Sequence, residues 1–210
     1  MSTKKYIVEF IGTFFLVFTI GMCVIATPAG TIPPLAIGAV LMTMIFAGGH
    51  ISGAHYNPAV TLAVTLRGKC PTSDVAPYMI AQVVGAVLAA LAVQFLKGDV
   101  EVEAMKLVIA NALLAEFLFT FALCYVVLNV ATAKGTSGNP TYGLAIGFTV
   151  LAGAFAVGPV SGGAFNPAVA VALTYWGVAA PASIWIYLVA NFAGGAAAAA
   201  TFKFLNPDDK

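Results

Sequence analysis

Charged residues are scarce in this 210-residue chain. Asp, Glu, Lys and Arg together make up 8% of the sequence, 61% of the residues are hydrophobic, and the mean hydropathy is +0.99. No charged side chain occurs from residue 10 to 66 or from residue 135 to 202, and a third charge-free run covers residues 75 to 96. Soluble globular domains are about one quarter charged, so this composition excludes that class and indicates a protein that crosses the membrane several times.

Cysteine is also rare, and the net charge is close to zero. Cys23, Cys70 and Cys124 are an odd, dispersed set with neither metal nor redox spacing, so they predict no disulfide framework and are best interpreted as small packing residues. The net charge of +1 gives no indication of nucleic acid. No nucleophile with a base, metal-ligand spacing or phosphate loop is present, so we expect no enzyme, no metal site and no cofactor.

The long apolar runs must be divided into several crossings, because one crossing takes about 20 residues. Turn residues and short charged connectors separate six spans. These spans cover approximately residues 6–26, 35–48, 77–96, 107–131, 142–158 and 184–204. The sequence therefore predicts an all-α polytopic membrane protein.

A nine-residue element occurs twice. Ser-Gly-Ala-His-Tyr-Asn-Pro-Ala-Val at residues 52–60 matches Ser-Gly-Gly-Ala-Phe-Asn-Pro-Ala-Val at residues 161–169, with a constant offset of 109. Asn is a favoured N-cap and Pro a favoured first helical residue, so each copy predicts a helix start. The following segments, 59–66 and 168–176, are too short to cross a bilayer. They are predicted to be half-helices that enter the membrane from a loop.

The duplication extends over most of the chain. Gly38 corresponds to Gly147, and Glu9 in the first span is echoed by Glu116 in the fourth. We expect one transmembrane domain over residues 1–210, built from repeats 1–97 and 107–206 with a connector at 98–106. Each repeat has three crossings, an odd number, so the second is inverted relative to the first.

Inversion brings the two half-helices together from opposite faces. Irregular backbone at membrane depth must be buried or line a water-filled cavity. The half-helix N-termini carry partial positive charge, and the Asn57 and Asn166 amides have N–H donors to offer a lumen. This arrangement suits a neutral solute with an oxygen lone pair and repels cations.

The distribution of basic residues predicts the orientation. With the N-terminus in the cytoplasm, seven basic residues lie inside and two, Lys97 and Lys106, lie outside. The seven are Lys4, Lys5, Arg67, Lys69, Lys134, Lys203 and Lys210. We therefore expect both termini to be cytoplasmic.

The chain resembles the aquaporin and glycerol-facilitator family, the major intrinsic proteins. The resemblance rests on the paired Asn-Pro-Ala boxes, the Ser-Gly dipeptide before each box, the layout of the spans and the two glutamates. The resemblance implies passive conduction of water or small neutral solutes, a homotetramer with one pore per subunit, and a place in the plasma membrane. It places Asn57, Pro58, Ala59, Asn166, Pro167 and Ala168 at the pore centre, Ala54, His55 and Gly162 along the pore, and Glu9 and Glu116 as supports that accept N–H bonds from the loops.

One position departs from the family pattern. Most members carry Arg directly after the second box, in the outer selectivity filter, and this chain has Val169. The family spacing places Ile37, Ala154, Gly163 and Val169 at that filter. The Asp typical of glycerol facilitators is also absent, since Ala170 stands there. We expect a wide, apolar filter that admits larger neutral solutes, offers fewer hydrogen bonds, and has lost one barrier to cations.

Alternatives remain open at this point. Water, glycerol, urea, ammonia, hydrogen peroxide, carbon dioxide and metalloid hydroxides all suit a wide apolar mouth. A non-conducting, gas-conducting or ion-leaky protein of the same fold with a structural role is the second hypothesis, and a coupled carrier that relays protons through Glu9 and Glu116 is the third. His50 and His55 are each interpreted as a hydrogen-bonded structural group, or else as a gate or pH sensor. Tyr6, Trp176, Trp185 and Tyr187 are expected to anchor the spans at the membrane interface.

Overall fold

The computed structural model describes residues 2–26 and 32–209, and every regular element in those ranges is a helix. The long helices are α1 (Ser2–Val24), α2 (Pro33–Ser52), α4 (Thr72–Lys97), α5 (Ile109–Val127), α6 (Tyr142–Ser161) and α8 (Ile184–Leu205). The short helices are α3 (Pro58–Leu66) and α7 (Pro167–Tyr175), with a π-helical turn at Leu128–Thr132 and 3-10 turns at Lys134–Thr136 and Pro181–Ser183. Residues 1, 27–31 and 210 lie outside the described residues, and with them Lys210 and the predicted end of the first span at residues 27–30.

Six helices within the described ranges are long and apolar enough to cross a membrane. Each begins or ends at turn residues or charged connectors, as the sequence predicts. The expected class, an all-α membrane protein with six spans and two half-helices, is therefore confirmed.

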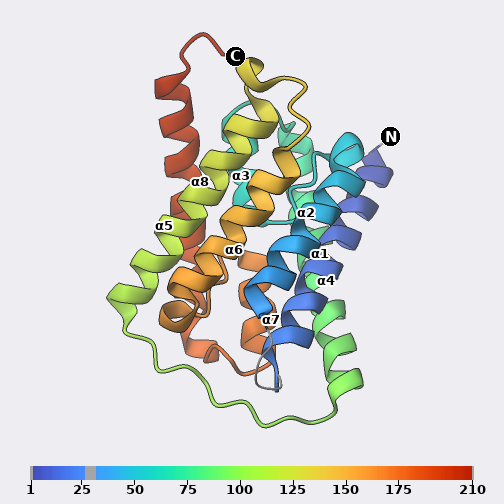
Figure 1. Cartoon of the computed structure of the whole chain (residues 1–210), viewed down its shortest axis with the longest axis vertical. Coiled ribbons are helices and arrows are strands. Elements are labelled where there is room, and N and C mark those ends of the chain that lie inside the picture. Colours follow the sequence, from blue (N-terminus) through green and yellow to red (C-terminus); the bar gives the residue numbers. More distant parts are fainter. Residues whose placement is uncertain (1, 27–31, 210) are drawn as a thin grey trace.

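The two halves of the chain use the same helix contacts. α1 packs on α4 in the first half and α5 on α8 in the second, while α2 and α6 pack on each other across the halves. Each half-helix is embedded in the opposite half, since α3 packs against α8 and α7 against α4. Both termini lie at one end of the molecule, with α3 toward that end and α7 toward the other (Figure 1).

Glycines at equivalent positions allow these close approaches. A Cβ on Gly85 would lie 2.7 Å from the carbonyl oxygen of Phe10, and a Cβ on Gly194 would lie 2.7 Å from that of Phe117. α1 and α4, and likewise α5 and α8, thus come into contact through their backbones, as small-residue interfaces in membranes do. The repeat seen in the sequence is present in the packing.

The helices before the loops are longer than expected. α2 runs to Ser52 and α6 to Ser161, beyond the ends predicted near residues 48 and 158. Gly48 is not a helix stop, because a Cβ there would lie 2.0 Å from the hydroxyl oxygen of Tyr56, so the glycine makes room for that side chain. The actual C-caps are Gly53 and Gly162, whose φ angles of +88° and +89° suit the left-handed cap that glycine favours.

Two further expectations were wrong in detail. α4 begins at Thr72, five residues before the expected start, and keeps Pro77 inside its first turns. Its first turn carries Asp74, which accepts a hydrogen bond from the Tyr6 hydroxyl (2.9 Å) and pairs with Lys5 (3.2 Å). Tyr187 is not an interfacial anchor, since it is fully buried and donates to the carbonyl oxygen of Ser161 (2.6 Å).

Candidate functional site

The half-helices α3 and α7 begin at the predicted residues. Asn57 is the N-cap of α3, where its Oδ1 accepts from the Ala59 N–H (2.8 Å), and Asn166 caps α7 through the Ala168 N–H (2.9 Å). Both Asn residues have extended backbone, and Pro follows each as the first helical residue. The caps satisfy one N–H of each helix and leave the positive ends of both dipoles facing inward.

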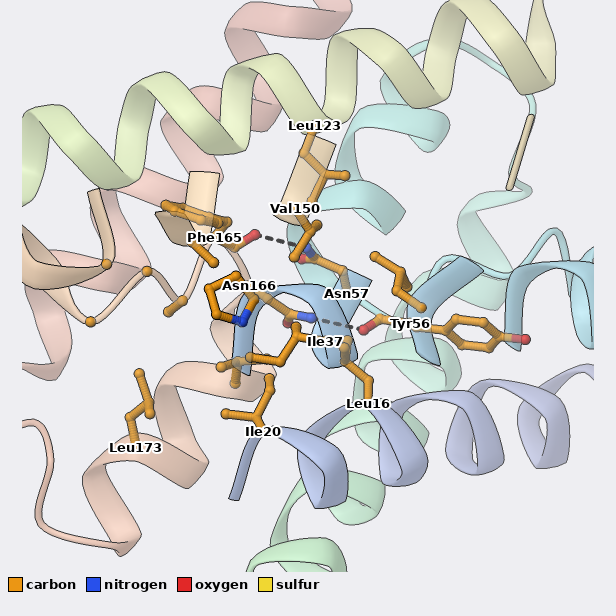
Figure 2. Close-up of a pocket in the computed structure, with 18 of the residues that line it drawn as sticks. Leu16, Ile20, Ile37, Tyr56, Asn57, Leu123, Val150, Phe165, Asn166 and Leu173 are labelled. Atoms are coloured by element: carbon orange, nitrogen blue, oxygen red, sulfur yellow. Dashed lines mark hydrogen bonds between the residues drawn. The ribbon is translucent and has the colours of Figure 1, made fainter. Parts of the chain in front are cut away.

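The two Asn-Pro loops are also bound to each other. Asn57 Nδ2 donates to the carbonyl oxygen of Phe165 (2.8 Å), and Asn166 Nδ2 donates to that of Tyr56 (2.9 Å). Figure 2 shows this reciprocal pair, with the two amides side by side between the loops. Because an amide NH₂ carries two hydrogens, each Asn keeps one N–H beyond the crossing bond. The two loops therefore supply one further amide donor each at the point where they meet.

A buried glutamate holds the first loop. Glu9 is fully buried and accepts four hydrogen bonds. Its Oε1 accepts from Ser52 Oγ (2.6 Å) and the His55 N–H (3.0 Å), and its Oε2 accepts from the Tyr56 N–H (2.7 Å) and Gln82 Nε2 (2.8 Å). Four donors to one carboxylate fix the loop backbone.

The second loop is held in the same way. Glu116, also fully buried, accepts from Ser161 Oγ (2.7 Å) and the Ala164 N–H (2.9 Å) through Oε1. Its Oε2 accepts from the Phe165 N–H (2.7 Å) and Asn191 Nδ2 (2.9 Å). The donors around the two carboxylates belong to the loops, to the last residues of α2 and α6, and to α4 and α8. Each glutamate therefore ties a loop to the helix bundle.

These carboxylates hold strained backbone. Ala54, Tyr56 and Phe165 have φ angles of 51°, 50° and 48°, in the left-handed region that is unfavourable for residues with a side chain. Each such residue costs on the order of 1–3 kcal/mol unless its surroundings impose it. The N–H groups of Tyr56 and Phe165 bind a glutamate, and their carbonyl oxygens accept the crossing amides, so both residues are held on two sides.

A central cavity of about 300 Å³ lies beside the loop junction. Among the described residues, polar side chains occur in its wall only near the junction, at His55, Asn57 and Asn166, apart from the hydroxyl of Tyr56, which is bound to the Met44 carbonyl. The rest of the wall is apolar, as Figure 2 shows for several labelled residues. It includes Leu16, Ile20, Val24, Pro33, Pro34, Ile37, Leu41, Ile45, Val60, Met105, Leu123, Val127, Ile146, Val150, Ala154, Gly158, Pro159, Val169, Leu173 and Val178.

The predicted site residues are distributed as follows. The four filter positions Ile37, Ala154, Gly163 and Val169 all line this cavity, as do Ala54, His55 and Gly162. Of the six residues of the two boxes, only the asparagines line it. Pro58, Ala59, Pro167 and Ala168 are buried in the packing instead. A Cβ on Gly195 would lie 2.7 Å from the Ala59 carbonyl oxygen, which shows how tightly α3 packs on α8.

A second cavity, of about 460 Å³, opens toward the end that holds the termini. Its wall includes Lys5, Lys69, Cys70 and Asp74. His55 and Val127 belong to the walls of both cavities, so these two side chains lie between the central cavity and the second one.

His55 is itself held within hydrogen-bonding distance of Thr61, with Nδ1 and Oγ1 3.1 Å apart. His50, by contrast, lines neither cavity. No cluster of three or more His, Cys, Asp or Glu side chains suited to a metal ion occurs in the described residues.

The sequence analysis did not identify several residues that build this site. Gln82 and Asn191, which bind the two glutamates, are polar residues inside otherwise apolar spans, and they stand 109 residues apart like the Asn-Pro boxes. That offset is the signal by which both were recognisable. Met105 also lines the central cavity, although its connector carries no repeat or motif.

Comparison with known proteins agrees with this geometry. The model of the major intrinsic protein family matches residues 1–202. Aquaporin NIP1-1 of Arabidopsis thaliana is 38% identical over 99% of this chain and 75% of its own length, and aquaporin NIP1-1 of Oryza sativa subsp. japonica is 36% identical over 99% and 76%.

Among solved structures, the aquaglyceroporin from Plasmodium falciparum superposes with a TM-score of 0.82, covering 99% of this chain and 98% of that one at 22% identity. That likeness supports the fold, while the family match and the plant relatives establish the kinship. The six apolar helices, the crossed Asn-Pro loops and these comparisons together place the chain in the major intrinsic protein family, as an integral membrane channel for water or small solutes and not an enzyme.

Proposed function

We propose that this protein is a passive channel for water and small neutral solutes, with an outer constriction that is wider and less polar than one containing an arginine. The pore in this proposal runs through the central cavity, past Asn57 and Asn166, and between His55 and Val127 into the second cavity. Repeats 1–97 and 107–206 form one such channel.

The observation that carries the proposal concerns the central cavity, where the polar side chains of the described wall gather at the junction of the two half-helices. There the inner ends of α3 and α7 contribute positive potential, and each asparagine contributes an N–H beyond its crossing bond. A neutral solute with an oxygen lone pair gains hydrogen bonds at this point, whereas a cation meets a positive potential and no acidic side chain among the described residues of the central cavity wall. These features favour neutral solutes.

The outer wall decides which neutral solutes enter. Ile37, Ala154, Gly163 and Val169 offer no side-chain donor or charge. A solute that sheds water there loses hydrogen bonds without replacement, at a cost of roughly 1–3 kcal/mol for each polar group. The absence of a long side chain at these positions leaves more room. We therefore expect a weak discrimination by size, with glycerol-sized solutes admitted alongside water.

Substitution of Val169 tests this proposal. Proteoliposomes containing the intact chain, Val169→Arg or Val169→Leu are compared by stopped-flow light scattering for water and for glycerol. We expect the intact chain to exceed empty liposomes for both solutes, and Val169→Arg to reduce glycerol flux by tenfold or more while retaining water flux. Val169→Leu is the matched control, because it fills space without adding charge, and its effect on glycerol should be smaller.

The second hypothesis is a protein of this fold that does not conduct water or glycerol and serves a structural role or passes gases or ions. The same apolar outer wall favours it, because a dewetted constriction blocks water. Flux of water and glycerol no greater than through bare lipid would support this hypothesis against the first. Measured fluxes of carbon dioxide and of potassium then distinguish a gas-conducting protein, an ion-conducting protein and a purely structural one.

Assembly and orientation complete the proposal. The basic residues of the end that holds the termini, against Lys97 and Lys106 at the other, favour termini in the cytoplasm. Membership of the family favours a homotetramer with one pore in each subunit, placed in the plasma membrane. Chemical crosslinking in membranes tests the tetramer, and protease access to tags at each terminus tests the orientation.

A further inference from the structure

One side chain of the connector between the two repeats, that of Met105, lines the central cavity. Residues 98–108 run as an extended segment across the end of the molecule opposite the termini (Figure 1). All of these residues are described, and among them only Met105 lines the central cavity. The four filter positions are therefore not the whole of the outer wall.

The connector is held in a way that directs this side chain inward. The Met105 N–H donates to the carbonyl oxygen of Val178 (3.0 Å), a residue that follows α7 and also lines the cavity. On either side, Val102 and Leu107 are partly buried against the core, whereas Glu103 and Lys106 carry exposed side chains. The segment thus has an apolar inner side and a charged outer side, with Met105 on the inner one.

The Met105 sulfur lies close to the predicted filter positions. A Cβ placed on Gly162 would lie 3.5 Å from Met105 Sδ, and Gly162 directly precedes the filter position Gly163. Ala154 and Gly163 carry almost no side chain, so they cannot close the opening. Methionine is unbranched, has three rotatable bonds and fills irregular gaps.

We propose that Met105 is a specificity-determining residue, a movable fifth wall of the outer constriction that sets the upper size of the solute. The inference rests on the proposed channel function. A thioether adds neither a charge nor a donor, so Met105 restricts size without restoring the polarity that an arginine would supply. Its flexibility makes the size limit gradual.

Cysteine modification tests the position without changing the fold. Met105→Cys is reconstituted in proteoliposomes and treated from outside with a membrane-impermeant, positively charged methanethiosulfonate reagent. The intact chain, which retains its own three cysteines, is treated identically as the reference, and Glu103→Cys, at an exposed site on the same connector, is the matched control.

We expect the untreated Met105→Cys protein to conduct glycerol, modification to reduce that flux at least fivefold, and a reducing agent to restore it. The control and the reference should change by less than twofold. Met105→Ala should in addition raise the flux of a four-carbon polyol relative to glycerol.

Full modification of Met105→Cys, measured by mass, with unchanged flux overturns the inference, as does failure of the introduced thiol to react. Both results leave the proposed function standing. An intact chain that moves no solute overturns the proposed function and this inference with it.

Discussion

Arg67 and Asp209 are 142 residues apart in the sequence, and their side chains form an ion pair with 2.6 Å between Nη2 and Oδ1. The Arg67 side chain is only 1% exposed and lies over the ring of Phe202, with 4.6 Å from Cζ to the ring centroid. Asp209 also accepts from the backbone N–H of Lys134 (2.7 Å). The C-terminal segment is thereby fastened to the end of α3 and to the turn that precedes α6.

Asp209→Asn should loosen this attachment and lower thermal stability. The Lys134 N–H, together with the Arg67 guanidinium, holds the pKa of Asp209 below its ordinary value. A carboxyl with a lowered folded pKa contributes stability above its unfolded pKa of about 4 and loses it as the pH falls through the folded pKa. The difference in unfolding midpoint between the intact chain and Asp209→Asn should therefore be full near pH 7 and shrink below about pH 4.

Thermal unfolding in detergent from about pH 3 to about pH 8 measures this difference across the window in which the carboxyl titrates. Asp208→Asn is the control, because its side chain is exposed and its backbone carbonyl is the group that contacts Lys134. A midpoint difference that stays constant over the whole range would mean that the carboxylate charge plays no part.

Glu116→Gln should weaken the second loop. All four groups around this carboxylate are donors, so the amide NH₂ of glutamine faces donors and loses at least two charge-assisted hydrogen bonds. At about 1.5 kcal/mol each, the loss is on the order of 3 kcal/mol. We expect a lower unfolding midpoint and less flux per reconstituted protein, with Glu103→Gln unchanged at its exposed site. Full flux and native stability in Glu116→Gln would show that the loop holds its shape without the charge.

Gly147→Ala should strain the crossing of α2 and α6. Gly38 and Gly147 are equivalent positions of the two repeats, and they contact each other. The new Cβ would lie 2.5 Å from the Gly38 carbonyl oxygen and 2.9 Å from Met42 Cβ. Overpacking of this kind typically costs about 1–3 kcal/mol. Gly135→Ala, where no atom lies within 4 Å of the added carbon, is the control for thermal unfolding; equal midpoints for the two variants would contradict the close approach.

Local signals in the sequence were sufficient for the half-helices and the membrane spans. Asn57-Pro58 and Asn166-Pro167 specify helix starts through their own capping chemistry, and the charge-free runs specify the spans. The Glu-Phe dipeptide that occurs in the first and fourth spans matches Glu9 with Glu116. These features depend on neighbours in sequence or on copies of one another, so they are readable without the fold.

Features that depend on distant neighbours were not predictable in this way. Gly48 is a packing glycine inside α2 and not its end, since the Tyr56 hydroxyl occupies the space that a Cβ would fill. Tyr187 is buried because its hydroxyl reaches the Ser161 carbonyl, 26 residues away. The inward position of Met105 depends on one backbone bond to Val178. Each of these follows from tertiary packing that overrides the local preference of the residue.

The crossed bonds between the Asn-Pro loops also bear on how the chain is made. The Tyr56 carbonyl is bound by an amide that is synthesised 110 residues later, and the strained backbone at Tyr56 has only its glutamate contact until then. We therefore expect the first loop to reach its final shape only after the second Asn-Pro loop has been inserted. Completion of the pore is then a late event in biosynthesis, because each loop needs the other to complete its hydrogen bonds.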